Sequence, residues 1–318
     1  MVTKKICILG GTGFVGHHLV NRLVKEGYQI RLLTRHRERH RELLVLPNVE
    51  ILDADIFNID VLTSQFKDCD TVINLVGILN SRSHQDHEFR KVHVELAHTI
   101  VQACRRTRTQ RLLHMSALNA DASQGSSYYL RTKGDAESFL VATKDLDITI
   151  FRPSVIFGRD DSFINRFASI LKHVPLFLPL ACPDTKMAPV HIGDVVSAFA
   201  HSLKDRHTIG QRYDLCGPKT YSLKQLVEYI AAITCQRKKV LGLNDTFSKM
   251  QALMLEFAPG KPFSMDNYRS LQTDSVCTGE FPAIFAIKPT PLEAVAPLIL
   301  QDAHCVSRYP HFRSKARR

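Results

Sequence analysis

The stretch ICILGGTGFVGHHL, residues 6–19, decides the fold of this chain of 318 residues. An apolar run is followed by a glycine-rich turn and then by a helical pattern, which predicts a strand, a tight turn and a helix. Gly10, Gly13 and Gly16 have the spacing G-x-x-G-x-x-G. In this frame the first glycine permits the turn, the second lets the backbone approach a pyrophosphate, and the third brings helix and strand close together.

The turn therefore predicts a dinucleotide site, because the free amides at the start of a helix bind a diphosphate. We expect Thr12, Phe14 and Val15 to contribute to this site together with the glycines. A tight turn without a ligand is the competing interpretation.

Apolar runs and helical patterns alternate through the first half of the chain. This alternation predicts an α/β fold, a Rossmann doubly wound parallel sheet covered by helices on both faces. Strands are expected at residues 5–10, 29–35, 49–55, 70–77, 111–117 and 147–153, and helices at 15–27, 58–68, 86–106 and around Tyr129.

The pattern changes beyond Arg152. Prolines cluster between residues 175 and 189, and the later segments are mostly helical. We expect residues 1–152 to form the nucleotide-binding domain. Residues 153–318 would form a smaller substrate or partner region that does not extend the sheet regularly and packs over its carboxyl edge.

The end of the second expected strand, residues 34–37, indicates which dinucleotide binds. An NAD site usually has an acidic residue here, which accepts a hydrogen bond from the ribose 2′-hydroxyl. This chain has Arg35 and Arg37 instead, which can bind a 2′-phosphate. The segment therefore predicts NADP(H) rather than NAD(H). A solvated basic turn is the alternative, and it is our interpretation of Arg39 and Arg41.

The ends of the third and fourth strands supply further cofactor contacts. Asp55 and Ile56 could frame the adenine, although an acid in a surface turn is an alternative for Asp55. Leu75, Val76 and Gly77 end the fourth strand, where a small residue lets the backbone approach the cofactor.

The segment YYLRTK, residues 128–133, holds a pair of groups suited to proton transfer. At about 100° per residue, Tyr129 and Lys133 lie on one helix face, whereas Tyr128 points about 140° away from the lysine. A phenol titrates near pH 10, so acid–base work at neutral pH would need about 4 kcal/mol of preference for phenolate. The Lys133 ammonium, one helical turn away in a cleft without water, can supply much of this free energy.

The charge of the chain is strongly basic. Its 42 Lys+Arg exceed its 31 Asp+Glu, for a net charge of +11. This balance favours anionic partners, and the tail RYPHFRSKARR, residues 308–318, could contact an anionic membrane surface or be a solvated end. We expect no nucleic-acid site, because the basic segment RRTRTQR, residues 105–111, lacks interleaved aromatics.

The remaining composition favours a cytoplasmic protein, at most peripheral on the cytoplasmic face of the inner membrane. The eight cysteines are widely spaced, which fits reduced thiols. The N-terminus leaves no room for a signal or transit peptide, and no apolar run is long enough for a bilayer span. His84 and His87 have ligand-like spacing, but nothing nearby completes a metal site.

The motifs GGTGFVG, NLVGIL, HMSALNA, YLRTK and APVHIGDVVSAF resemble those of the short-chain dehydrogenase/reductase superfamily, in its extended, atypical branch. The stretch GRDDSFINRFA, residues 158–168, points to the complex I alpha subcomplex subunit 9-like family, whose bacterial relatives are described as epimerase/dehydratase-like. The similarity spans nearly the full chain.

This resemblance implies roles for several residues of these motifs. Tyr129 would be the general acid or base, Lys133 would bind the nicotinamide ribose and lower the pKa of the tyrosine, and Ser116 would hold the substrate oxygen. Where fuller members carry an asparagine, this chain has His93. Three residues at the end of the sixth strand would lie beside the nicotinamide half: Arg152, Pro153 and Ser154.

Two functions are compatible with these features. The first is an NADP(H)-binding accessory, assembly or redox-sensing factor linked to respiratory complex I or to proteins of quinone biosynthesis. The second is an active NADPH-dependent reductase or epimerase-like enzyme that uses Tyr129 and Lys133.

Overall fold

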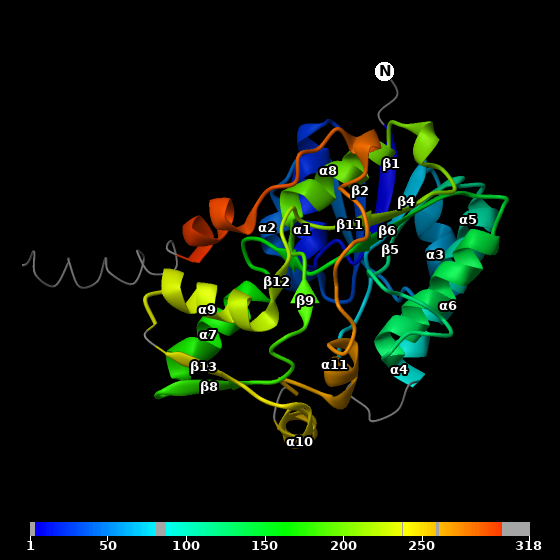
Figure 1. The fold of residues 1–318 in the computed structure, drawn as a ribbon. Coiled ribbons are helices and arrows are strands. Elements are labelled where there is room, and N and C mark those ends of the chain that lie inside the picture. The colour runs from blue at the N-terminus through cyan, green and yellow to red at the C-terminus, as the bar shows by residue number, and fades with distance from the viewer. Residues whose placement is uncertain (1–3, 81–86, 237, 259–260, 301–318) are drawn as a thin grey trace, which may run out of the picture. The chain divides into compact units, whose positions relative to one another are not determined.

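A computed structural model describes residues 4–80, 87–236, 238–258 and 261–300, and Figure 1 shows its ribbon. The chain forms two compact units. The first comprises Met1–Pro153, Val195–Leu215 and Pro282–Ile287, and the second comprises Ser154–Asp194, Cys216–Phe281 and Lys288–Arg318. The first unit therefore includes two segments from beyond Arg152.

The first unit is built on a seven-stranded sheet with the order β11-β6-β5-β4-β1-β2-β3. All neighbouring strands are parallel, which confirms the doubly wound Rossmann sheet. The winding reverses between β1 and β4, and ligands of such sheets bind at the carboxyl ends of the strands at this point. The strands are β1 Lys5–Leu9, β2 Gln29–Thr34, β3 Val49–Asp53, β4 Thr71–Asn74, β5 Arg111–Met115, β6 Asp147–Pro153 and β11 Arg212–Leu215.

Strand β11 corrects the expectation that the chain beyond residue 152 does not extend the sheet. Its residues pair in parallel with the end of β6, from Arg212 opposite Ile150 to Leu215 opposite Pro153. Strand β11 lies at the edge of the sheet, and only its last residue, Leu215, is fully buried. The other positions can therefore be polar, and the sequence RYDL has no apolar run. The sequence pattern therefore gave no signal for it.

Helices cover both faces of this sheet (Figure 1). On one face, α3, α5 and α6 bury apolar side chains such as Phe66, Ile100 and Leu140 against Val72 and Leu112 of the sheet. On the other face, Phe199 of α8 stacks on Phe151 of β6 with ring centroids 3.9 Å apart. The helices of this unit are α1 Phe14–Lys25, α2 Arg41–Leu44, α3 Ile59–Phe66, α4 His87–Arg90, α5 Leu96–Thr107, α6 Tyr128–Ala142 and, from Val195 onward, α8 Ile192–Ser202.

The second unit combines short paired strands with helices around its own core, which includes Leu171, Leu226 and Ile230. Residues 292–300 are helical as well. The strand pairs are β7 Ile156–Phe157 with β10 Val190–His191, β9 Lys186–Met187 with β12 Tyr221–Ser222, and β8 Phe177–Leu180 with β13 Lys239–Gly242. The other helices are α7 Ile164–His173, α9 Leu223–Ile233, α10 Asp245–Glu256 and α11 Met265–Ser270. Within the described ranges, no helix has the length and apolar character that crossing a membrane requires.

A disulfide joins Cys216 and Cys277 within the second unit, with their Cα atoms 6.0 Å apart. The expectation of reduced thiols is therefore wrong for this pair. The two cysteines are 61 positions apart in the sequence and meet only through folding, so their spacing does not reveal the bond. Five other cysteines are free, and Cys305 lies outside the described residues.

The disulfide predicts a difference in the number of reactive thiols. The denatured protein should take up two fewer alkylating groups before reduction than after it, counted by intact mass. The Cys216→Ser/Cys277→Ser variant should show no such difference. Equal labelling of the parent protein before and after reduction would contradict the bond.

Candidate functional site

The glycine turn brings the ends of β1 and β4 into close contact. Gly10 has a positive φ of 75°, and a Cβ added there would lie 3.0 Å from the backbone of both Leu75 and Val76. At Gly16, an added Cβ would lie 2.4 Å from Gly11 Cα. A side chain at either position would separate backbone segments that are now packed together, so both glycines are required by the geometry.

The start of α1 is arranged to receive an anion. Gly13 caps the helix in an extended conformation, without a side-chain hydrogen bond. An added Cβ there would meet only Gly10 O, at 3.3 Å, so the turn is open on this side. The amides of Phe14, Val15 and Gly16 have no partner earlier in the helix because of their position. These donors and the open turn fit a dinucleotide diphosphate.

Arg35 and Arg37 follow β2 and are both exposed. Neither guanidinium has a hydrogen bond or ion pair within the described part of the chain, and only the backbone amide of Arg37 is bound, to Asp53 Oδ1 at 2.8 Å. Both cations are therefore available to a phosphate group. Their contact with a cofactor remains a prediction.

Asp55 has a local structural role. Its carboxylate accepts a hydrogen bond from Phe57 N at 3.0 Å, and its carbonyl accepts one from Asn58 N at 3.2 Å. Ile56 is partly buried against the core of the first unit. This arrangement matches the turn interpretation of Asp55, and the adenine contacts of both residues stay predictions.

Lys133 links α6 to the loop after β4. Its side chain is only 3% exposed, and Nζ donates to Met115 O at 3.0 Å and to Val76 O at 3.5 Å. A Cβ added to Gly77 would lie 3.3 Å from Nζ, so the lysine lies close against the backbone of this glycine. Burial lowers the pKa of Lys133 to about 8, although nearby Glu137 acts in the opposite direction.

Tyr129 lies one helical turn before Lys133 on α6 and is partly buried. Burial raises the pKa of Tyr129 to about 12. This direction is opposite to the one that the resemblance implies, and the Lys133 ammonium is directed at two carbonyl oxygens. At neutral pH the phenol is therefore protonated.

His93 packs edge-on against the Tyr129 ring, with centroids 5.6 Å apart. It lies in a π-helical turn, Lys91–Glu95, and its Nε2 accepts a hydrogen bond from Ile78 N at 3.3 Å. Because Nε2 accepts, Nδ1 carries the proton and donates to Thr132 Oγ1 at 2.8 Å. Burial, reinforced by Lys133, lowers the pKa of His93 to about 2, so the imidazole is neutral.

Ser116 is buried directly after β5, and its hydroxyl donates a hydrogen bond to Glu137 Oε1. Arg152 Nε lies 3.4 Å from the same Glu137 oxygen, and its Nη1 lies 3.4 Å from Asp214 Oδ1. Its Nη2 donates a hydrogen bond to Ala120 O at 3.2 Å. Burial raises the pKa of Glu137, although the hydrogen bond from Ser116 and the charge of Arg152 act in the opposite direction. The Ser116 hydroxyl and the Arg152 guanidinium thus both have internal partners, and their roles toward substrate and nicotinamide remain predictions.

The two other residues expected beside the nicotinamide lie at the end of β6. The carbonyl of Pro153 accepts a hydrogen bond from Leu118 N at 3.0 Å. Ser154 belongs to the second unit, where its Oγ donates to Ser275 O at 2.7 Å.

Sequence reasoning missed Glu137 and His114. Glu137 follows Tyr129 and Lys133 at four-residue intervals on one face of α6, and this spacing could have revealed it. His114 is buried in β5, its Nδ1 lies 3.1 Å from Asn74 Nδ2, and burial lowers its pKa to about 3. A histidine inside an apolar strand gave no comparable signal. His84, which has ligand-like spacing with His87, lies outside the described residues.

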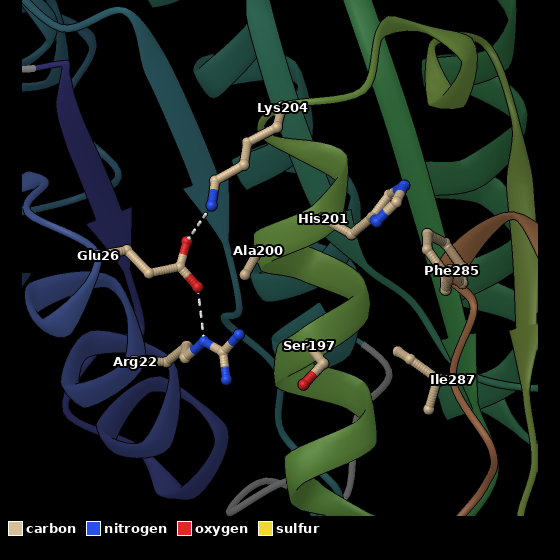
Figure 2. Close-up of a pocket in the computed structure, with 8 residues that line it drawn as sticks. All are labelled: Arg22, Glu26, Ser197, Ala200, His201, Lys204, Phe285 and Ile287. Carbon is tan, nitrogen blue, oxygen red and sulfur yellow. Dashed lines mark hydrogen bonds and ion pairs between the residues drawn. The ribbon is translucent and has the colours of Figure 1, made fainter.

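A separate cavity of about 330 Å³ lies between α1 and α8, and Figure 2 shows the residues that line it. Glu26, at its edge, lies 2.6 Å from Arg22 and 2.8 Å from Lys204, so each of these cations already has an acidic partner. The remaining lining includes Phe285 and Ile287. Arg22 and Glu26 lie at the end of α1 opposite to the glycine turn, so we do not assign the dinucleotide to this cavity.

The pKa of Lys133 predicts a pH-dependent affinity for the dinucleotide. Lys133 is mostly charged at pH 7 and mostly neutral at pH 9, while the shifted pKa values of Tyr129, His93 and His114 lie outside this range. If the ammonium binds the ribose, affinity should fall as the pH rises through about 8. Calorimetric titration from pH 7 to 9 measures this fall. The Lys133→Met variant should bind more weakly with a flat profile, and an unchanged slope in that variant would contradict the assignment.

Comparisons with known proteins concern the nucleotide-binding segment and the fold. Residues 10–165 match a family model described as NAD(P)H-binding. Subunit 9 of the NADH dehydrogenase [ubiquinone] 1 alpha subcomplex from Rattus norvegicus is 29% identical over 293 residues, which cover 90% of this chain and 77% of that protein. A ceramide reductase from Caulobacter vibrioides is 26% identical over 195 residues, or 60% of this chain and 58% of that one.

The fold is shared with solved structures of low sequence identity. The crystal structure of the protein called gox2253 superposes with a TM-score of 0.77 at 19% identity, over 95% of this chain and 99% of that chain. The chain therefore contains a segment that matches an NAD(P)H-binding family model on a Rossmann-like fold, and it resembles complex I alpha subcomplex subunit 9 over most of its length.

Proposed function

We propose that this protein is an NADP(H)-binding accessory, assembly or redox-sensing factor linked to respiratory complex I or to quinone metabolism. The observation that carries the proposal is the hydrogen bond from Ser116 to Glu137. It engages the hydroxyl that would otherwise hold a substrate oxygen beside Tyr129. Similarity to a complex I subunit over 90% of the chain also supports this function.

The preference for NADP(H) is part of the proposal. It is supported by two exposed cations after β2, Arg35 and Arg37, and by their lack of acidic partners in the described ranges. The bound dinucleotide would supply a transferable hydride. The amides at the start of α1 would bind its diphosphate, and Lys133 would donate to its ribose hydroxyls in place of Met115 O and Val76 O.

A second candidate is an NADPH-dependent reductase or epimerase-like enzyme. It is favoured by the placement of Tyr129 and Lys133, one turn apart on α6 next to the loop that carries Gly77. A phenol with a raised pKa is protonated at neutral pH and suits the donation of a proton to a carbonyl oxygen during reduction.

Single-turnover oxidation of protein-bound NADPH separates the two functions. The protein would be mixed with a panel of quinones, ketones and nucleotide sugars while NADPH fluorescence is followed. The accessory function predicts tight binding without oxidation. Oxidation that is abolished in Tyr129→Phe, with NADPH affinity retained, would establish the enzyme and overturn our preference.

The proposed location is cytoplasmic and peripheral, on the cytoplasmic face of the inner membrane. The net charge of +11 supports contact with an anionic surface. The basic tail that suggested this contact, residues 308–318, lies outside the described residues. Fractionation of cells into membrane and supernatant, with and without a high-salt wash, tests the location.

A further inference from the structure

Helix α10 and the residue that follows it, Phe257, carry large apolar side chains on the outside of the second unit. Five of them are between 49% and 72% exposed. At about 100° per residue they occupy one arc of about 120°. The members of this outer stripe are Phe247, Met250, Leu253, Met254 and Phe257.

The inner face of α10 is small and polar, and it attaches the helix to the segment around β8. Ser248 and Ala252 are buried, and Ser248 Oγ accepts a hydrogen bond from Cys182 N at 3.1 Å. Gln251 Nε2 donates to Pro179 O at 3.0 Å. The helix is thus held along its length, and the outer stripe does not rotate inward without breaking these bonds. Figure 1 shows α10 nearly end-on beside β8 and β13.

The neighbouring strands of the same unit add further exposed apolar side chains. Leu176 and Phe177, at the start of β8, and Leu241 of β13 are between 46% and 74% exposed. Phe177 pairs with Lys239 and Pro179 pairs with Leu241, which places these residues on one face of the two-stranded sheet. Exposed apolar side chains gathered on one face of an element are typical of an interaction site.

The charges around these residues favour an anionic partner. Lys249 of α10, Lys239 of β13 and Lys172 of α7 are exposed. The two acids of α10 keep their charge, because Asp245 accepts from Tyr268 Oη at 2.5 Å and Glu256 from Met265 N at 3.4 Å, which are neutral donors, and the three exposed lysines outnumber them. The net charge of +11 acts in the same direction.

We propose that α10 lies flat in the headgroup–acyl boundary of an anionic membrane, with the outer stripe inserted among the lipid chains. Phenylalanine, leucine and methionine on one face, with Lys249 at its margin, are features of helices that lie at a membrane interface. The lysines would bind lipid phosphates. This inference deepens the proposed peripheral location, and it rests on none of the residues of the dinucleotide site.

A single introduced tryptophan tests the insertion directly, because the natural chain contains none. Leu253→Trp should show a blue-shifted emission with vesicles of phosphatidylcholine and phosphatidylglycerol, and its emission should be quenched by brominated acyl chains. Leu298→Trp is the matched control, because Leu298 is 66% exposed outside the stripe and should show neither effect. An emission of Leu253→Trp that does not respond to these vesicles would overturn the proposal.

Charge substitutions then identify the binding surface. Met250→Glu/Met254→Glu should lower the vesicle partition coefficient, measured by cosedimentation, by about a hundredfold or more, on the order of what burial of two methionine side chains is worth. Val45→Glu/Leu298→Glu makes the same change in charge at two exposed apolar positions elsewhere and should bind as the parent does. NADPH affinity, measured in both variants, should be unchanged. This readout separates failure of the membrane surface from failure of the cofactor site.

Two other outcomes would also overturn the proposal. If the parent protein is a dimer without lipid and the stripe variants are monomers in sedimentation velocity, the outer stripe binds a second copy of the chain. If deletion of residues 308–318 abolishes vesicle binding while the stripe variants retain it, the basic tail is the binding element. Vesicles of phosphatidylcholine alone should bind more weakly than those with phosphatidylglycerol, and equal binding would contradict the role of the lysines.

Discussion

Gly16→Ala should abolish measurable dinucleotide binding and lower the free energy of unfolding by about 3 kcal/mol. The added Cβ would lie 2.4 Å from Gly11 Cα and 2.5 Å from Gly10 O, which are backbone atoms that move only with the whole turn. Such a movement displaces the amides at the start of α1 from the diphosphate. Calorimetric titration with NADPH and equilibrium denaturation in urea measure the two effects.

The matched control for this substitution is Gly279→Ala. A Cβ at Gly279 would have no heavy atom within 4 Å, and its φ is not positive. Binding and stability should both equal those of the parent protein. Dinucleotide affinity of Gly16→Ala within a factor of about three of the parent would show that the turn does not hold the diphosphate, since each lost charge-assisted hydrogen bond is worth at least that much.

Arg35→Ala should weaken NADPH binding by roughly 10- to 100-fold, the range of one or two hydrogen bonds to a charged group. NADH affinity should change little, because its ribose has no 2′-phosphate for the guanidinium to bind. The ratio of the two dissociation constants, measured at a fixed salt concentration, reports the effect. Arg39→Ala, in the same basic connection, is the control and should leave the ratio unchanged. Equal losses for both dinucleotides would mean that Arg35 does not select the phosphate.

The elements around the cofactor turn could be predicted because their signals are local. Six strands of the sheet are apolar runs a few residues long, and the glycine spacing directly follows the first of them. The placement of Tyr129 and Lys133 on one helix face also follows from local geometry. The fold and the phosphate-binding turn therefore needed no knowledge of contacts between distant segments.

The features that the sequence did not reveal depend on such contacts. Strand β11 is recognisable only next to β6, and the Cys216–Cys277 bond only after the second unit has folded. The hydrogen bond from Ser116 to Glu137 joins β5 to α6, and it makes a different use of the serine from the one that the motif implies. The raised pKa of Tyr129 has the same origin, because it reflects burial by segments that the helix pattern does not contain.

The late arrival of β11 bears on how the protein is made. While the ribosome is still synthesising residues 154–211, β6 is the last strand available on its side of the sheet, and its outer backbone groups have no partner. Unpaired strands of a nascent chain attract other chains and the holding factors that shield them. A gene fragment that stops near residue 153 should therefore yield insoluble protein, whereas one that continues past Leu215 gives β6 its missing neighbour.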